Sequence, residues 1–470
     1  MNNNQKWREY VTALSATLIT AAAGTTVGWT SPTLPILRAP DSPIQTSADQ
    51  SSWIASIMIL CSAASPIPAS YLAERIGPKK TLLLASVPYI VGWILVMFAG
   101  NVPTIYASRL ISGLGYGIAY TTAPMYLGEI ASDNVRGAMA TLITVMSKFG
   151  ILSQYCIGPY VSMLGLASFN IAIPILFVVT FSTMAESPYY YIKSGQRQEA
   201  EASLRKLRGK NYVREELESM TSLVTENMKE KGRWRDLFTV GGNRRGLIIL
   251  MGIYFTQQFC GSTAIITYAQ QIFGAAEGGL GAEESCILFG TVQLLTSAMS
   301  SQLVDRLGRK PLLLVSSCGV GLSNIIIGAY FFLKYQQSDI IISLKFIPII
   351  VIPIFIFSYT IGLATVPFAI TSEIFPTHIK AKATCAIQIF VALMTFAVTK
   401  LFQVVADDLG NHVAFWGFGV FSAAGVVFIF MYLPETKGQS FAAIQEKLYS
   451  SDKVVYEKDE DEMARVKITL

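Results

Sequence analysis

The sequence is short of charge for a chain of its length. Of 470 residues, 14% are charged and 52% are hydrophobic, whereas soluble domains usually carry about 25% charged residues. A water-soluble core of this size would not require so little charge. The chain is therefore expected to have lipid as its solvent, because apolar side chains on the outside of a protein carry no penalty there.

Residues that hold metals or drive catalysis are also scarce. The six cysteines stand singly and there are two histidines, so neither a zinc site nor a disulfide framework is indicated. No nucleotide-binding loop or nucleophile–base pair is present. We therefore expect no enzymatic activity, no cofactor and no metal, and nothing implies a nucleic acid or an obligate protein partner. No N-x-S/T sequence occurs, which argues against N-glycosylation.

Long apolar runs, in contrast, are abundant. A helix needs about 20 apolar residues to cross the hydrocarbon core of a bilayer, and twelve runs approach or exceed this length. The first run is too long for a cleavable signal sequence, so it is predicted to be the first span. The spans are predicted at 11–33, 51–73, 82–100, 104–127, 138–158, 168–185, 244–268, 285–304, 311–333, 345–371, 382–405 and 414–433.

Basic residues are distributed unevenly between the loops. Thirty of the 36 Lys and Arg residues lie in the two tails and in the loops after even-numbered spans, and three lie on the other side. The positive-inside rule therefore places both termini in the cytoplasm. A missed helix would scramble this asymmetry, so it also supports an even number of spans.

The predicted fold class is an all-α membrane protein with twelve transmembrane helices in two six-helix halves. Residues 1–185 are expected to form the N-terminal half and residues 244–433 the C-terminal half. Residues 186–243, between the halves, are charged and rich in helix formers, which predicts short cytoplasmic helices. Residues 434–470 are expected to form a cytoplasmic tail whose end is polar, mixed in charge and disordered.

The loops reveal an internal repeat between the halves. The loops after spans 2 and 8 share an acid–Arg–x–Gly pattern. After spans 4 and 10, an acidic residue precedes a basic residue by seven positions. A glutamate follows both span 6 and span 12. Parallel repeats of six helices are typical of one large class of secondary carriers. The matched residues are Glu74 and Arg75 with Asp305, Arg306 and Arg309, then Glu129 and Arg136 with Glu373 and Lys380, and finally Glu186 with Glu435.

These charged residues have two interpretations. Acids and bases at helix ends can pair with each other and with the helix termini. Pairs that form only when the cytoplasmic side is closed would hold the two halves together and favour one state of a two-state carrier. The alternative is that they only obey the positive-inside rule and cap helices. Matching pairs at three corresponding places favour the first interpretation.

Five motifs in order then identify a resemblance. From the first span to about Leu448, the chain resembles the sugar-porter branch of the major facilitator superfamily, the group of the glucose facilitators. One segment resembles the insect facilitated trehalose transporters in particular, namely Val398-Thr-Lys400 with Phe402-Gln403. The motifs are Arg109-x-x-x-Gly113-x-Gly115-x-Gly117 with Pro124-x-Tyr126, Gln257-Gln258-Phe-Cys-Gly261, Asp305-Arg-x-Gly-Arg-Lys310, Glu373-Ile-Phe-Pro376 and Pro434-Glu-Thr-Lys-Gly438.

The resemblance implies a sugar pocket between the halves. In the family, the paired glutamines of span 7 bind sugar hydroxyls, and they match Gln257 and Gln258. An amide offers donors and an acceptor to hydroxyls without charge, although an interhelical amide bond would also explain these residues. Gln293 matches a polar pocket position in span 8. The full set of predicted solute-binding residues is Gln257, Gln258, Thr263, Gln293, Phe368, Thr144, Thr30 and Lys148.

Several positions depart from the family pattern. Thr263 stands where the family has asparagine, and Phe368 stands where it has the tryptophan that packs on the sugar. Val391-Ala392 replaces an Asn-Trp pair. The pocket is thus less polar and less aromatic than in a glucose facilitator, and one lost buried hydrogen-bond partner can cost about 1–3 kcal/mol. These departures argue against glucose as the solute more strongly than they argue against transport.

The spans also lack the acid that proton coupling requires. Proton-coupled members of the family carry an acid in span 1 beside the span-4 arginine, and the matching residue here is Thr30. A proton carrier needs a group whose charge changes within the membrane. We therefore expect facilitated diffusion, driven by the solute gradient alone, and we expect Arg109 to bond neutral oxygens.

Lys148 stands near the middle of span 5, too deep for its ammonium group to reach the interface easily. One interpretation is that it faces a central cavity and binds a solute oxygen or an anion. The alternatives are that the span is misplaced, or that Lys148 pairs with backbone carbonyls in a wet crevice.

Taken together, the residues favour a carrier, and the resemblance implies a sugar uniporter of the plasma membrane that works by alternating access, with a small sugar and the lipid bilayer as its partners. Two alternatives stay open. One is a carrier for another small polar solute, either a polyol or an organic anion, the latter favoured by Lys148. The other is a non-transporting sugar sensor.

Overall fold

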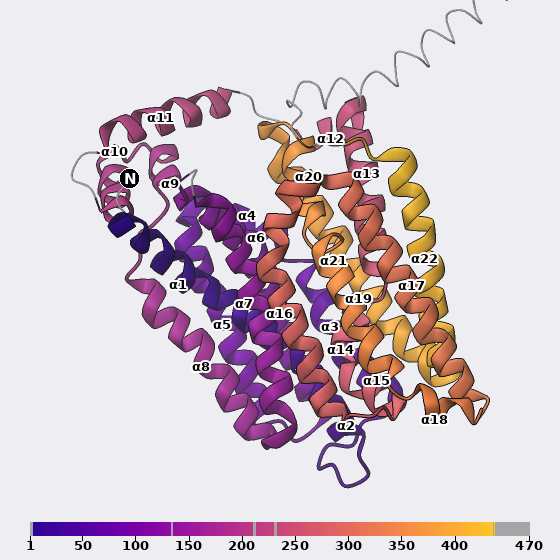
Figure 1. Cartoon of the computed structure of the whole chain (residues 1–470). Coiled ribbons are helices and arrows are strands. Elements are labelled where there is room, and N and C mark those ends of the chain that lie inside the picture. The colour runs from indigo at the N-terminus through magenta and orange to yellow at the C-terminus, as the bar shows by residue number, and fades with distance from the viewer. Residues whose placement is uncertain (1–2, 133–134, 210–212, 230–232, 436, 438–470) are drawn as a thin grey trace, which may run out of the picture.

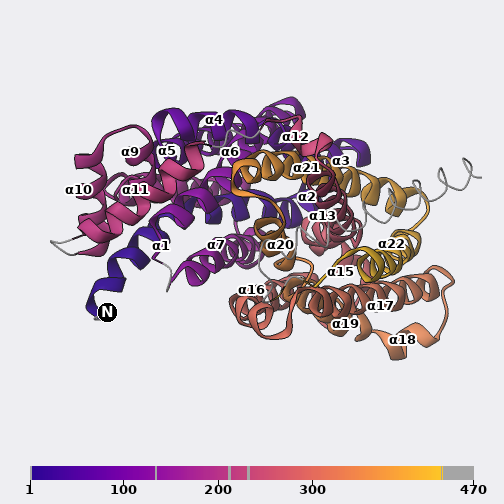
Figure 2. The ribbon, with the colours of Figure 1, turned by 90° about the horizontal axis from the view of Figure 1, so that it is seen from above.

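The computed structural model describes residues 3–132, 135–209, 213–229, 233–435 and 437, with the side chains of 3–6, 226–229, 301–306, 372, 377 and 378 outside the description. The secondary structure of the described residues is helical, and no strand occurs among them. Figures 1 and 2 show two groups of helices side by side, which we call the N-group and the C-group. The N-group comprises α1 (Asn3–Gly28), α2 (Thr30–Arg38), α3 (Ala48–Ser62), α4 (Pro66–Ile76), α5 (Pro78–Met97), α6 (Val102–Ile130), α7 (Arg136–Ile157), the short 3-10 helix η1 (Gly158–Tyr160) and α8 (Met163–Ser182).

The linker helices and the C-group follow. The linker helices are α9 (Pro188–Lys193), α10 (Arg197–Arg208), α11 (Arg214–Lys229) and α12 (Asp236–Thr239). The C-group comprises α13 (Gly241–Phe259), α14 (Ser262–Thr267), α15 (Ala269–Ala276), α16 (Ala282–Leu307), α17 (Arg309–Tyr335), α18 (Ile340–Leu344), α19 (Ile347–Ile361), α20 (Val366–Ile374), α21 (Thr377–Asp408) and α22 (Asn411–Tyr432). The linker helices lie at one end of the bundle, here called the linker face, and α2, α15 and α18 lie at the other end, the opposite face (Figure 1).

Most predicted spans correspond to helices that could cross a membrane. Among the described residues, nine helical stretches are long and apolar enough, and the bent pair α3 and α4, whose axes meet at 43°, makes a tenth. The two remaining predicted spans are α6 and α16, with 29 and 26 residues. At about 1.5 Å of rise per residue, both are longer than the hydrocarbon thickness of about 30 Å.

Four of the predicted spans are interrupted: the second is the bent pair α3 and α4, and the other three break as follows. The first divides into α1 and α2 at Trp29, the seventh divides into α13 and α14, and the tenth divides into α19 and α20. Gly261 separates α13 from α14 with a φ of +85°, in the left-handed region that glycine adopts without strain. A broken helix leaves backbone carbonyls without helical partners, and these carbonyls are available to side chains and ligands.

Small residues set the spacing between α1 and α7. A Cβ on Gly24 would lie 2.0 Å from the carbonyl oxygen of Ser147, and one on Gly150 would lie 2.2 Å from that of Ala21. Only glycine therefore permits this approach of the two backbones, as in other membrane helix pairs. Between the groups, α7 packs on α16 and α3 packs on α21. These two contacts form the seams along which the groups meet.

The linker is docked on the N-group by a buried ion triad. The guanidinium of Arg208 pairs with Glu9 of α1 at 2.9 Å and with Glu216 of α11 at 2.8 Å. It also donates to the carbonyl of Ile130, at the end of α6, at 2.9 Å. Arg208 is buried, and its partners lie on three other helices, α1, α6 and α11. It therefore fixes the position of the linker helices.

Candidate functional site

The paired glutamines at the end of α13 join two helix breaks. The amide nitrogen of Gln257 donates to the carbonyl of Leu363 at 2.6 Å. Leu363 lies between α19 and α20, so this bond links the break of the tenth predicted span to the seventh. Gln258 in turn donates to the amide oxygen of Gln257 at 2.9 Å. The structure thus brings both predicted residues into one buried network.

Two threonines complete this network. The hydroxyl of Thr395 in α21 donates to the amide oxygen of Gln258 at 2.9 Å, and the hydroxyl of Thr263 in α14 does so at 3.3 Å. Thr263 was predicted from the sequence, whereas Thr395 was missed because no motif marks it. Each glutamine amide has two N–H groups and uses one of them in the bonds described. A second donor on each therefore remains for a solute hydroxyl.

Gln293, in α16, is the buried polar side chain of the predicted set that lacks partners. It is fully buried, and neither its amide nitrogen nor its amide oxygen has a hydrogen-bond partner among the described residues. A buried amide without partners costs about 1–3 kcal/mol per polar group. Such groups are usually met by ordered water or by a ligand. Gln293 is therefore placed to receive a polar occupant.

Lys148 and Gln293 lie on facing sides of the seam between α7 and α16. A Cβ on Gly290 would lie 2.8 Å from the ring of Tyr155 and 3.0 Å from a methyl of Leu152, so these residues mark the contact. Lys148 shares one face of α7 with Leu152 and Tyr155, and Gln293 shares one face of α16 with Gly290. The two helices run in opposite directions (Figure 1). Lys148 and Gln293 therefore both lie about one helical turn closer to the linker face than the contact between Gly290 and Leu152.

The environment of Lys148 answers part of the question that the sequence left open. The residue lies within α7, Arg136–Ile157, which matches the predicted span at 138–158 in extent. Its side chain is half-buried, and it forms no hydrogen bond or ion pair with the residues that the structure describes. Pairing with backbone carbonyls is thus not what holds it.

The other predicted solute-binding residues are more scattered. The hydroxyl of Thr30 is buried and donates to the carbonyl of Val27 at 2.9 Å, so it is already satisfied. Thr144 is half-buried on α7, one turn before Lys148. Phe368 is 52% exposed and places its ring at right angles to that of Tyr254, with the centroids 6.1 Å apart. In the described part of the chain, these three residues make no hydrogen bond or ring contact with the glutamine network.

Arg109 is held by neutral oxygens, as predicted. Its guanidinium donates to the carbonyl of Thr26 at 2.7 Å and to that of Ile54 at 3.1 Å. It also lies over the ring of Trp29, 5.5 Å from the centroid. Arg109 therefore ties α6 to α1 and α3 without a carboxylate partner among the described residues.

At the linker face, the sequence repeat is also a structural repeat. Gly77 and Gly308 have φ values of +95° and +91° and join α4 to α5 and α16 to α17. Glu186 accepts the backbone N–H of Lys79 at 2.9 Å, just after the first glycine. Glu435 likewise accepts the backbone N–H groups of Arg309 and Lys310 at 3.0 Å, just after the second. Each glutamate thus caps the turn of its own group.

Glu186 lies between α8 and α9, outside the spans. Burial raises the pKa of its carboxyl, and the backbone N–H groups that it accepts oppose this shift. The carboxylate is therefore held in a place where protonation is favoured more than in water.

Some of the remaining charged residues of the repeat have partners, and others form no ion pair with the described residues. Arg309 pairs with Glu373 at 2.8 Å, and Glu129 accepts a hydrogen bond from the hydroxyl of Ser187. Arg136 is also engaged. Glu74, Arg75 and Lys380 form no ion pair with the described residues, although Arg75 lies over the ring of Tyr71 at 5.3 Å. The side chains of Asp305 and Arg306 lie outside the description.

Two ion pairs at the opposite face were not predicted. Arg38 of α2 pairs with Asp407 of α21 at 3.0 Å. Lys400 of α21 pairs with Asp49 of α3 at 2.6 Å and also donates to the hydroxyl of Ser52. Both pairs join the N-group to the C-group. The sequence offered one signal, since Arg38 is one of the few basic residues away from the linker side.

The fold, the broken helices and the inward amides together define a membrane carrier, and comparison with known proteins supplies the family. The family model for "Sugar (and other) transporter" matches residues 4–448, and the chain belongs to this family.

Relatives and solved structures agree with this assignment. The chain is 32% identical over 454 residues to the facilitated trehalose transporter Tret1 of Bombyx mori, covering 96% of this chain and 88% of the relative. The Tret1 of Anopheles gambiae is 32% identical over 446 residues, and the chain spans 56% of that longer protein. The inward-open xylose transporter XylE of E. coli matches with a TM-score of 0.78 at 20% identity, covering 93% of this chain and 99% of XylE. The XylE match shows a shared fold, that of the major facilitator superfamily, as predicted.

Proposed function

We propose that this protein carries a neutral sugar, such as trehalose or a hexose, across a membrane by facilitated diffusion and alternating access. The observation that carries the proposal is Gln293, whose two buried amide atoms have no hydrogen-bond partner among the described residues. Independently, the Gln257–Gln258 network spans two helix breaks, where unwound helices commonly hold the solute of a carrier. These amides carry no charge and match sugar hydroxyls as donors and acceptors. The relatives named as trehalose transporters support the same solute class.

The proposal includes the topology and the moving units. Residues 1–185 and 244–433 would rock against each other as two halves, joined by residues 186–243, with residues 434–470 as a tail. The excess of Lys and Arg on the linker side favours the cytoplasm for that face and for both termini. The plasma membrane is the proposed location. The linker-face residues Glu129, Arg136, Glu373 and Lys380 would meet across the halves when that face closes, while the Arg309–Glu373 pair is kept within the C-group.

The test is uptake of radiolabelled trehalose and glucose into proteoliposomes of the purified protein, with and without an imposed pH gradient. Saturable uptake that does not respond to the pH gradient is expected, because Thr30 occupies the place of a coupling acid and Arg109 bonds neutral oxygens. A folded protein that takes up neither sugar would contradict the proposal and favour a sensor or a different solute.

Gln293→Leu separates a binding role from a structural one. If the amide waits for a solute, its removal raises KM about tenfold or more, because one or two hydrogen bonds to the sugar are lost. The same change removes two buried groups without partners, so the melting temperature should rise. A lower melting temperature with unchanged KM would show that Gln293 is structural. Gln336→Leu, an exposed amide at the end of α17, is the matched control.

An organic anion is the second candidate solute, favoured by Lys148. Its ammonium group lies on the face of α7 that meets α16, and it has no partner among the described residues. Lys148→Met should then abolish uptake of a small carboxylate while leaving trehalose uptake within about twofold. If trehalose and carboxylate uptake are both unchanged, Lys148 has no part in solute binding.

A further inference from the structure

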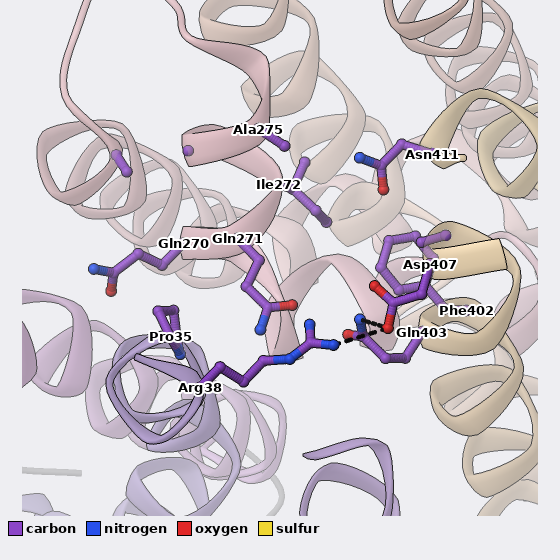
Figure 3. Close-up of a pocket in the computed structure, with 13 residues that line it drawn as sticks. Pro35, Arg38, Gln270, Gln271, Ile272, Ala275, Phe402, Gln403, Asp407 and Asn411 are labelled. Carbon is purple, nitrogen blue, oxygen red and sulfur yellow. Dashed lines mark hydrogen bonds and ion pairs between the residues drawn. The ribbon is translucent and has the colours of Figure 1, made fainter. Parts of the chain in front are cut away.

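A cavity lies at the opposite face, between the two helix groups. Its volume is about 480 Å³, within the range of about 300–1,000 Å³ that is usual for small-ligand pockets. Its walls come from α2 of the N-group and from α15, α16, α21 and α22 of the C-group (Figure 3). None of the eight predicted solute-binding residues lines it. The cavity is therefore separate from the candidate solute site.

The charges of this cavity cancel. Arg38 and Asp407 are its two charged lining residues, and they pair with each other across it at 3.0 Å. Gln403 donates to the same carboxylate oxygen of Asp407 at 2.8 Å. The other carboxylate oxygen accepts no hydrogen bond from the described residues. A neutral ligand fits this balance better than an ion, since an ion would meet an already compensated pair.

Two amides of the lining have atoms without partners. Gln403 is 3% exposed, and its amide oxygen has no hydrogen-bond partner in the described part of the chain. The amide nitrogen of Gln271 is also buried and unpartnered. Figure 3 shows Gln271, Asp407 and Asn411 directed toward a common space. Buried amide atoms nearly always have partners, so these atoms mark a place for a polar ligand.

The available groups alternate between donors and acceptors. The amide oxygen of Gln403 and the second oxygen of Asp407 accept, the nitrogen of Gln271 donates, and the amide of Asn411 can do both. A hydroxyl also donates and accepts, so several hydroxyls on one small molecule could satisfy the set together. Phe402 adds an apolar wall for the carbon side of such a molecule.

We propose that this cavity binds a neutral polyhydroxylated solute from the solution at the opposite face, and that the bound solute stabilises the state in which this face is closed. Arg38 belongs to the N-group and its partners to the C-group, so the cavity is complete only while the groups meet here. A ligand that binds one state shifts the population toward it. The binding site does not depend on what the protein carries, whereas its effect on uptake rests on the proposed function.

The test is equilibrium binding of radiolabelled trehalose to the purified full-length protein. Two binding components are expected. Gln271→Leu and Gln403→Leu should each weaken one component by about 3- to 10-fold, the effect of losing one hydrogen bond, while the control Gln336→Leu changes neither. Gln271→Leu removes an amide nitrogen that bonds nothing in the described structure, so the variant is expected to fold.

The outcomes separate this proposal from the proposed function. A single component that disappears in Gln293→Leu, or two components that Gln271→Leu leaves unchanged, would overturn the second site. A component that is sensitive to Gln271→Leu in a protein that transports no sugar would support the second site and sink the proposed function. In uptake assays, high external trehalose should slow wild-type uptake, and Gln271→Leu should relieve this inhibition. Inhibition that persists in Gln271→Leu would overturn the regulatory effect.

Discussion

The two faces of this protein use their ion pairs differently. At the linker face, Arg309 pairs with Glu373 inside the C-group, and Arg208 joins Glu9 to the linker. At the opposite face, Arg38 with Asp407 and Asp49 with Lys400 connect one group to the other. The first kind of pair fixes helix ends within a unit, and the second kind holds two units together.

This difference teaches which contacts a moving carrier can lose. A pair inside one unit survives when the units rock, so it can be buried and strong. A pair between units must break in each cycle, so it should be weak enough to reform. The exposures agree with this division, because the Arg208 and Glu9 side chains are 1% and 2% exposed, whereas those of Arg38 and Asp407 are 27% and 34% exposed.

The largest expected effect comes from breaking the buried triad of the linker face. Arg208→Met leaves the carboxylate of Glu9 buried without its guanidinium, and removing one partner of a buried pair costs about 3–5 kcal/mol. The purified variant should melt at a clearly lower temperature, measured by thermal unfolding in detergent.

Arg205→Met is the matched control for that change. Arg205 pairs with Glu201 on the same helix, but the two side chains are well exposed, and such a pair is worth about 0–1 kcal/mol. Equal melting temperatures for Arg208→Met and Arg205→Met would contradict the contrast between buried and exposed pairs.

A smaller effect is expected from breaking both pairs of the opposite face. Each exposed pair is worth about 0.2–1 kcal/mol, so Arg38→Gln with Lys400→Gln should shift the population away from the closed state by about 2- to 30-fold. Spin labels at the exposed positions Ile36 and Leu409 would report the distance between the two groups.

Lys334→Gln provides the control at the same face. Lys334 pairs with Glu277 inside the C-group at 3.1 Å, so its loss should leave the distribution of label distances unchanged. A distribution that the double variant also leaves unchanged would mean that the pairs between the groups do not hold this face closed.

The smallest effect concerns protonation at the linker face. Burial raises the pKa of Glu186 above its usual value of 4.5, so the folded protein binds a proton more readily than the unfolded chain does. Stability from this group is therefore greatest at low pH and falls as the pH rises through the raised pKa. As the pH falls from 7.5 to 5, the melting temperature of the wild type should rise relative to that of Glu186→Gln. Glu199→Gln, at an exposed position of α10, should not reproduce this change, and a constant difference between wild type and Glu186→Gln across the pH range would refute the argument.

Much of the fold could be predicted because its signals are local. Each span is an apolar run of membrane length, and the repeat of Gly77 and Gly308 lies in short motifs whose φ values and glutamate caps the structure reproduces. The breaks in the seventh and tenth spans were not predicted, since the Gly, Ser and Thr residues around Gly261 and Leu363 are also tolerated inside continuous membrane helices. In the tenth span, the carbonyl freed at Leu363 accepts the amide of Gln257 from α13, a contact that is distant in sequence.

For the candidate site, too, some features could be predicted from the sequence and others depend on the tertiary structure. The sequence by itself determined the membrane class and the two repeated sets of helices, and it singled out Gln257, Gln258 and Gln293 as candidates, because composition, run length and motif spacing are properties of the chain alone. It could not determine that the amide of Gln293 lacks partners while that of Gln258 is engaged by Thr395, nor that Arg38 meets Asp407 across 369 positions of sequence. Those facts depend on which helices become neighbours, and only the tertiary structure decides this, because side-chain hydrogen bonds and ion pairs act over a few ångströms in space and carry no trace in local sequence.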